Sequence, residues 1–191
     1  GVKVYRHDSR NPASIPSDFV WAIAEDAAGD LWIGTDGGGL ARWERKTDRF
    51  TTYRNDPEDE ASLPSNRVRA VAVDRSGFVW AGTKGGGLAR LDRSTGRFTR
   101  FRHDAARPSS LSHDEVFVIR EGRGSALWVG TDAGLDRLDA ATGGFVHEVL
   151  GASPQSNGDR KVRAIEEDAA GNLWVGTFGG GLVELRIGAR V

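Results

Sequence analysis

A motif of about 25 residues occurs four times in this chain, and this repetition restricts the folds that the chain can adopt. Each copy contains a tryptophan at steps of roughly 48, 48 and 46 residues, and these are Trp32, Trp80, Trp128 and Trp174. The copies consist of short apolar runs separated by glycine-containing turns, without an apolar stripe at helical spacing. Units of this length with four strands each are typical of propeller blades. The sequence therefore predicts an all-β protein, a β-propeller of four four-stranded antiparallel blades.

We expect the four blades to form a single domain, residues 1–191, because similar units stack on their neighbours. The predicted blades are residues 20–56, 68–104, 116–150 and 162–187. The fourth copy has sequence for three strands only, whereas VKVYRHD near the start matches the outer strands FTTYRND and FTRFRHD. We therefore expect residues 1–8 to complete the last blade and to close the ring, which would cover two exposed strand edges.

The first turn and the second strand of each blade hold the residues that we expect to maintain the fold. DAAG, which begins at Asp26, has the residue preferences of a type I turn. The turn glycines of the three regular copies are Gly29, Gly77 and Gly171. The tryptophan that follows each turn is expected to lie as a wedge between blades, since such a side chain buries about 150–250 Å².

Two copies depart from the common pattern. In the turn before the outer strand, Asp48 takes the place of the glycine of other copies, and aspartate tolerates the left-handed region. In the third copy, Gly122 replaces the turn aspartate and Ser125 replaces the turn glycine. We expect the third blade to be the least regular.

Composition excludes several classes of function. The net charge is −1, and lysine and arginine are spread through every copy, so we expect no nucleic-acid partner. No stretch approaches the roughly 20 apolar residues of a membrane span, and the first residues do not form a signal peptide. The absence of cysteine excludes disulfides and thiol chemistry. Because the chain begins with Gly1 and contains no methionine, we expect it to be a segment of a longer protein.

The sequence indicates no catalytic residue, metal or cofactor. The glycine-rich turns lack the GK[ST] of a phosphate-binding loop and a following helix. Ser112, His113 and Asp114 are consecutive and so cannot converge as a catalytic triad. No histidine pair has metal spacing, and the acidic run at residues 56–60 lacks the pattern of a calcium loop.

A binding site is expected where the copies differ from one another, in the loops at one mouth of the central channel. The loops into the inner strands and the inner-strand residues after them contribute Asp18, Asn66, Asp114, Arg160, Trp21, Arg69, Phe117 and Arg163. The loops between the second and third strands contribute Asp36, Lys84, Asp132 and Phe178. Such a rim could stack on sugar rings and bind their hydroxyl groups. A hydrated rim without a ligand is the alternative.

The repeated pattern V-x-A-[IV]-x-x-D-x-x-G-x-[LV]-W-x-G-T-x-G-G-G-L, with a later S-L-x-S-N, resembles the two-component regulator propeller repeat. This resemblance implies a non-catalytic, periplasmic or extracellular ligand-sensing domain of a bacterial hybrid histidine kinase or diguanylate cyclase. The ligand implied is a small polar molecule, often an oligosaccharide.

Two further hypotheses come from other classes of protein. The low blade count favours an oligomerisation scaffold, in which two copies share an eight-bladed ring. An enzyme ranks last: some bacterial lyases use similar propeller repeats, but this sequence offers no acid, base or metal constellation.

Overall fold

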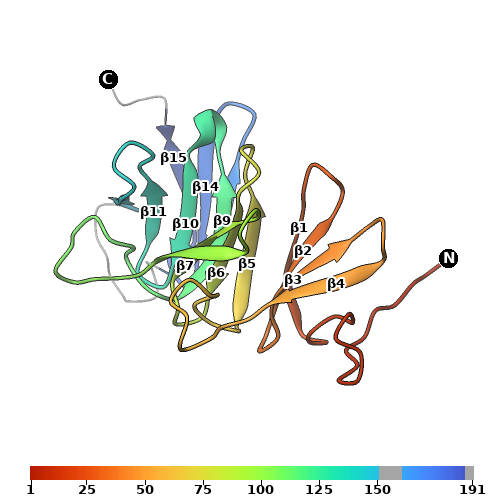
Figure 1. Ribbon diagram of the computed structural model, residues 1–191. Helices are drawn as coiled ribbons and strands as arrows, with labels where there is room; N and C mark the ends of the chain where they lie inside the picture. Colours follow the sequence, from red (N-terminus) through yellow and green to blue (C-terminus); the bar gives the residue numbers. More distant parts are fainter. Residues whose placement is uncertain (151–160, 188–191) are drawn as a thin grey trace.

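The chain folds into four antiparallel sheets, seen in a computed structural model that describes residues 1–150 and 161–187 (Figure 1). Blade 1 consists of β1 (Val20–Glu25), β2 (Leu31–Thr35), β3 (Gly39–Glu44) and β4 (Arg49–Tyr53). Blade 2 consists of β5 (Val68–Val73), β6 (Val79–Thr83), β7 (Leu88–Asp92) and β8 (Arg97–Phe101). Blade 3 consists of β9 (Val116–Glu121), β10 (Leu127–Thr131), β11 (Leu135–Leu138) and β12 (Phe145–Glu148). Blade 4 consists of β13 (Val162–Glu167), β14 (Asn172–Thr177) and β15 (Leu182–Arg186).

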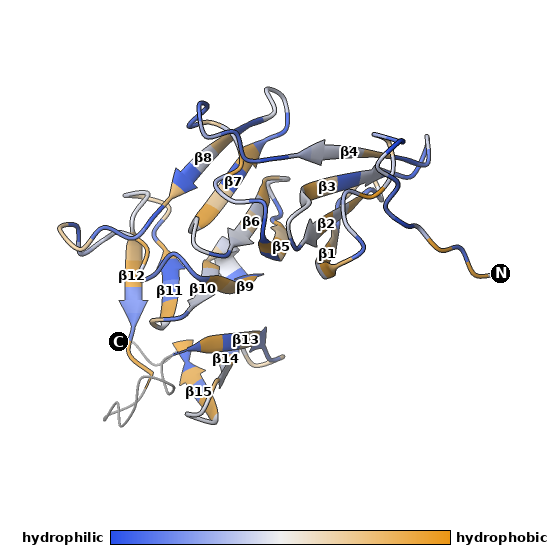
Figure 2. Cartoon of the chain, turned by 90° about the horizontal axis from the view of Figure 1, so that it is seen from below, coloured by the Kyte–Doolittle hydropathy of each residue, from blue (hydrophilic) through white to orange (hydrophobic). Residues whose placement is uncertain are grey.

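The four-bladed, all-β architecture predicted from the repeats is confirmed. Within every sheet the strands pair in chain order, so each blade is a simple meander. The inner strands β1, β5, β9 and β13 pack successively against one another. Figure 2 shows the sheets following one another along an arc that is open between blade 1 and blade 4.

The core lies between the blades and consists of apolar layers that neighbouring sheets share. The layer between blades 1 and 2 contains Trp32, Leu40, Val68 and Val79, all fully buried. Similar layers join blade 2 to blade 3 and blade 3 to blade 4. The second strands β6 and β10 are buried along their whole length, which explains why their sequences are nearly continuous apolar runs.

Three of the four signature tryptophans lie in these layers, as the sequence predicts, whereas Trp174 of blade 4 is 36% exposed and is not a wedge between two blades. The exposed fractions of Trp32, Trp80 and Trp128 are 0%, 3% and 3%. Each indole of the regular blades donates a hydrogen bond from Nε1 to the carboxylate of the aspartate that opens the preceding turn. These bonds join Trp32 to Asp26 (3.1 Å), Trp80 to Asp74 (2.8 Å) and Trp174 to Asp168 (3.0 Å). The aspartate therefore both forms the turn and orients the indole.

Glycine is required in the hairpin that follows the second strand. Gly39 has a φ of 87°, and a Cβ at that residue would lie 2.2 Å from the carbonyl oxygen of Tyr53. The hydroxyl of Thr35 donates to the carbonyl oxygen of Gly39 at 2.8 Å and closes the turn. In the next turn Asp48 has a φ of 57°, so the expected left-handed conformation is confirmed.

The expectation that residues 1–8 complete blade 4 is wrong in this structure. These residues form no strand, and among the described residues β15 has no partner beyond β14. They run instead along blade 1, where the Tyr5 ring packs edge-on against Phe50 at 5.3 Å and its hydroxyl donates to Asp48. This is the contact that an outer strand makes with the next blade, since Tyr53 packs on Phe98 in the same way.

The physical reason is the way in which the four sheets are stacked. Residues 1–8 lie against blade 1, at the position that an outer strand of a preceding blade would take. Successive sheets rotate by too little for four of them to encircle an axis, so blade 4 stays away from this segment (Figure 2).

Blade 3 contains the irregular turn that its sequence predicts. A short 3₁₀ turn, η1 (Arg123–Ser125), replaces the regular turn, and Ser125 has a φ of 62°. Because Gly122 lacks a carboxylate, the indole Nε1 of Trp128 has no hydrogen-bond partner among the described residues.

Blade 3 also contains a pair of linked substitutions. In blades 1 and 2 the entry loop has Pro16 or Pro64, which carries no N–H, and the third strand has alanine. Blade 3 has Ser112 and Asp136 at these positions, and the backbone N–H of Ser112 donates to Oδ2 of Asp136 at 2.8 Å. Asp136 is fully buried, and this burial raises the pKa of its carboxyl group although the bond from Ser112 opposes the shift.

We predict that Asp136→Ala and Ser112→Pro interact strongly. Asp136→Ala alone leaves the N–H of Ser112 without an acceptor and costs about 1–3 kcal/mol, whereas adding Ser112→Pro removes the N–H and recovers most of that loss. Urea unfolding of the two single variants and the double variant measures the interaction. Additive effects of the two substitutions would contradict this interaction.

We also predict a pH dependence of stability. Because the pKa of Asp136 is raised in the folded state, the contribution of Asp136 to stability falls as the pH rises from the ordinary pKa of aspartate through the pKa of the folded state. The double variant lacks this carboxyl group, so its stability should not show this decline.

We predict that the tryptophans differ in their contribution to stability according to burial. Trp80→Ala should cost about 3–5 kcal/mol, because it empties a space between two blades. Trp174 is 36% exposed, so Trp174→Ala should cost markedly less, about 1–2 kcal/mol. Urea unfolding measures both, and equal losses would contradict the packing described here.

Candidate functional site

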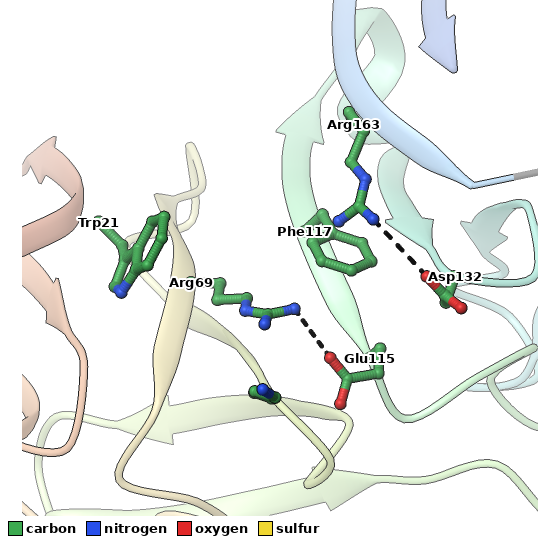
Figure 3. A pocket seen from close by; sticks show the side chains of 7 residues that line it. Trp21, Arg69, Glu115, Phe117, Asp132 and Arg163 are labelled. Carbon is green, nitrogen blue, oxygen red and sulfur yellow. Dashed lines mark hydrogen bonds and ion pairs between the residues drawn. The ribbon is translucent and has the colours of Figure 1, made fainter. Parts of the chain in front are cut away.

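A pocket of about 640 Å³ opens where the inner strands of the blades meet (Figure 3). Its lining comes from all four blades and is both aromatic and charged. The lining residues are Trp21, Arg69, Lys84, Glu115, Phe117, Asp132 and Arg163. All but Glu115 belong to the rim predicted from the sequence, so the structure brings half of that predicted set together.

A repeated bulge presents the inner-strand residues to the pocket. In each blade the pairing of the first and second strands shifts register at the second residue of the inner strand. The unpaired residues at these shifts are Trp21, Arg69, Phe117 and Arg163. A bulge redirects a side chain and bends its strand. The regular fold of every blade therefore delivers one variable side chain to the same place.

Phe117 lies between two guanidinium groups. The Cζ atom of Arg163 is 3.3 Å from the centre of its ring and that of Arg69 is 4.8 Å away. Stacking of this kind fixes the plane of a guanidinium group and leaves the N–H groups at its edge available for hydrogen bonds. Burial lowers the pKa of Arg163, although the nearby carboxylate of Asp132 opposes this shift.

Two carboxylates hold the cations of the pocket in position. Nη1 of Arg69 donates to Oε2 of Glu115 at 2.8 Å (Figure 3). Nζ of Lys161 donates to Oδ2 of Asp132 at 2.8 Å, and Nη2 of Arg163 is 3.7 Å from the other oxygen of that carboxylate. These pairs connect blade 2 to blade 3 and blade 3 to blade 4. They therefore stabilise the wall of the pocket and also place charged groups on it.

Three of the predicted rim residues have a role within the fold. Asp18, Asn66 and Asp114 each accept a hydrogen bond from a backbone N–H eleven residues earlier, at 2.7–2.8 Å. These bonds close the loops between blades. The three side chains therefore lie behind the pocket and not in its lining.

Two other predicted rim residues, Asp36 and Phe178, are not part of the pocket lining. The carboxylate of Asp36 is 3.4 Å from Nε of Arg67, and the Phe178 ring is 64% exposed with Arg163 beside it at 5.4 Å. Arg160 lies outside the described residues.

Sequence reasoning missed Glu115 and Lys161. Both stand immediately before an inner strand, where the other two copies have Phe19 and Arg67. This position varies between copies as much as the predicted ones do, so the same criterion would have found it. No clustered set of histidine, aspartate and glutamate that could hold a metal is found in residues 1–150 and 161–187. Over the same part of the chain, no helix is long and apolar enough to cross a membrane.

Comparison with known proteins identifies the repeats. A sequence model described as "Two component regulator propeller" matches residues 14–37, 62–85 and 157–179. No curated protein matches the chain significantly.

Among solved structures, the fold is similar to extracellular domains of bacterial signalling proteins. One is from a B. thetaiotaomicron protein described as a hybrid two component system, with 25% identity and a TM-score of 0.68 over 91% of this chain and 29% of that one. Another is virginiamycin B lyase from Staphylococcus aureus, with 16% identity and a TM-score of 0.61 over 90% of this chain and 56% of the lyase, a likeness of fold alone.

This chain thus spans less than a third of the length of the extracellular domain that it resembles. The three matched segments include the inner strand, first turn and second strand of blades 1, 2 and 4. Blades 1, 2 and 4 therefore each contain a segment that is similar to the two-component regulator propeller repeat.

Proposed function

We propose that this chain is a non-catalytic ligand-binding part of the extracytoplasmic sensor of a bacterial two-component or diguanylate-cyclase signalling protein. The repeat family and the similarity to an extracellular domain of a hybrid two component protein support the signalling context. The pocket supports the binding role, because it collects the variable residues of all four blades at one place.

The chemistry of the pocket favours a small polar ligand with a ring. The side chain of Trp21 is 61% exposed, which is unusual for an indole unless its face is available for contact. Stacking on such a face, combined with the charged groups beside it, is a common way to hold a sugar ring or a similar polar ring. This combination of an exposed aromatic face and fixed ionic groups is the observation that carries the proposal.

An enzymatic role is less well supported. The pocket contains no histidine, and Nδ1 of His113 lies 3.0 Å from the backbone N–H of Glu115, from which it accepts a hydrogen bond. The similarity to a lyase is confined to the fold.

We predict that Trp21→Ala lowers ligand affinity without unfolding the protein. Calorimetry against a panel of oligosaccharides should find at least one ligand, and Trp21→Ala should weaken its binding about tenfold, or roughly 1.4 kcal/mol. Phe78→Ala is the matched control, because Phe78 is also exposed but lies in the first turn of blade 2, away from the pocket. Absence of heat for every member of the panel would contradict the proposal.

A scaffold role is the second candidate, and exposed apolar side chains at the ends of the arc favour it. Ile23 on β1 and Leu182 on β15 are 62% and 67% exposed. If a second copy covers them, light scattering should give about twice the monomer mass of 20.6 kDa, and the double variant Ile23→Lys, Leu182→Lys should return it to the monomer value. A wild-type mass of 20.6 kDa would exclude this role.

A further inference from the structure

The charges that line the pocket do not balance. Two of its cations already have a close carboxylate, since Arg69 binds Glu115 and Lys161 binds Asp132, each at 2.8 Å. Both carboxylates of the pocket are engaged in these bonds. The lining thus carries three cations and two carboxylates: Lys84 has no carboxylate partner among the described residues, and Arg163 shares Asp132 with Lys161.

Lys84 is free to meet a ligand. It follows β6 and contributes its backbone to the fold, where its N–H donates to the carbonyl oxygen of Arg67 at 2.9 Å. Within residues 1–150 and 161–187, its ammonium group makes no hydrogen bond or ion pair. A lysine that lines a pocket in this state is a point charge available to an anion.

Arg163 has only a share of a carboxylate, because its ion pair with Asp132 is long and Asp132 also binds Lys161. Its distance of 3.7 Å to Asp132 exceeds that of a hydrogen bond, and the carboxylate is bound more closely by Lys161. Stacking on Phe117 at 3.3 Å fixes the guanidinium plane, so little rotational freedom is lost when its edge binds an anion. A planar two-oxygen group matches this edge best.

We propose that the pocket binds the carboxylate of an acidic sugar, with Lys84 and Arg163 as the groups that recognise the anion. This inference rests on the proposed function and gives the ligand a chemical class. The aromatic lining receives the sugar ring, and these two cations, one without a carboxylate partner and one that shares its carboxylate with Lys161, select the acidic form over the neutral one. Arg69 is a positioning residue, since Glu115 binds its guanidinium group while that group also lies over the ring of Phe117.

The probes are D-glucuronate and D-glucose, which differ only in the carboxylate at the sixth carbon. Amide chemical shifts of the ¹⁵N-labelled chain follow each titration, so that weak binding is measured and located. We expect glucuronate to bind at least about tenfold more tightly than glucose, with shifts at the pocket, and to weaken as salt is raised.

The variants Lys84→Gln and Arg163→Gln should each lower glucuronate affinity by about fivefold or more, a larger loss than either causes for glucose. Arg67→Gln is the matched control, because this cation precedes the inner strand of blade 2 but is outside the pocket lining. An unchanged amide spectrum away from the substitution shows that each variant is folded.

Equal affinity for the two sugars, or no greater loss in the two variants than in the control, overturns the inference and leaves the proposed function in place. If neither sugar nor any member of the oligosaccharide panel binds, the proposed function itself fails.

Discussion

The structure depends on the packing of a tryptophan between successive sheets. The indoles of Trp32, Trp80 and Trp128 each fill the layer between their own blade and the next. In blades 1, 2 and 4 an aspartate from the preceding turn fixes the direction in which the ring lies. The resulting contacts set the spacing and rotation of the blades. The inner strands then meet along one edge of the stack, and their bulged residues form the pocket. The stability of the blades and the position of the binding residues thus have one physical origin.

The same scaffold permits variation where function requires it. Bulged positions do not pair across the sheet, so their side chains can change without disturbing the strands. The four bulged positions accordingly hold different side chains: an indole, a phenyl ring and two guanidinium groups. These residues are Trp21, Phe117, Arg69 and Arg163. Ionic bonds between blades then tie the charged members to the wall. A binding surface formed in this way is specific to the chain although the fold beneath it is repeated.

Much of the fold was predictable because the four copies can be compared, so that a strand or turn that is ambiguous in one copy is indicated by the others. The wedge role of Trp32, the left-handed turn at Asp48 and the irregular turn of blade 3 were all predicted from comparison of the copies. Ring closure was predicted wrongly, because a missing strand in blade 4 and a matching strand at the start say nothing about the rotation between blades. The rim was predicted in part. The carboxylate of Asp114 binds a backbone N–H, which residue type alone does not reveal, while Glu115 was missed although its position varies between copies.

The central claim is that the signature tryptophans of blades 1, 2 and 3 are enclosed between successive sheets, whereas that of blade 4 is not. Exchange of the indole N–H protons with deuterated water, followed by NMR, tests this directly because each proton reports on one layer of the stack. The account predicts slow exchange for Trp32 and Trp80, which are buried and hydrogen-bonded, and fast exchange for Trp21 and for the part-exposed Trp174. Exchange at Trp32 or Trp80 as fast as at Trp21 would contradict it.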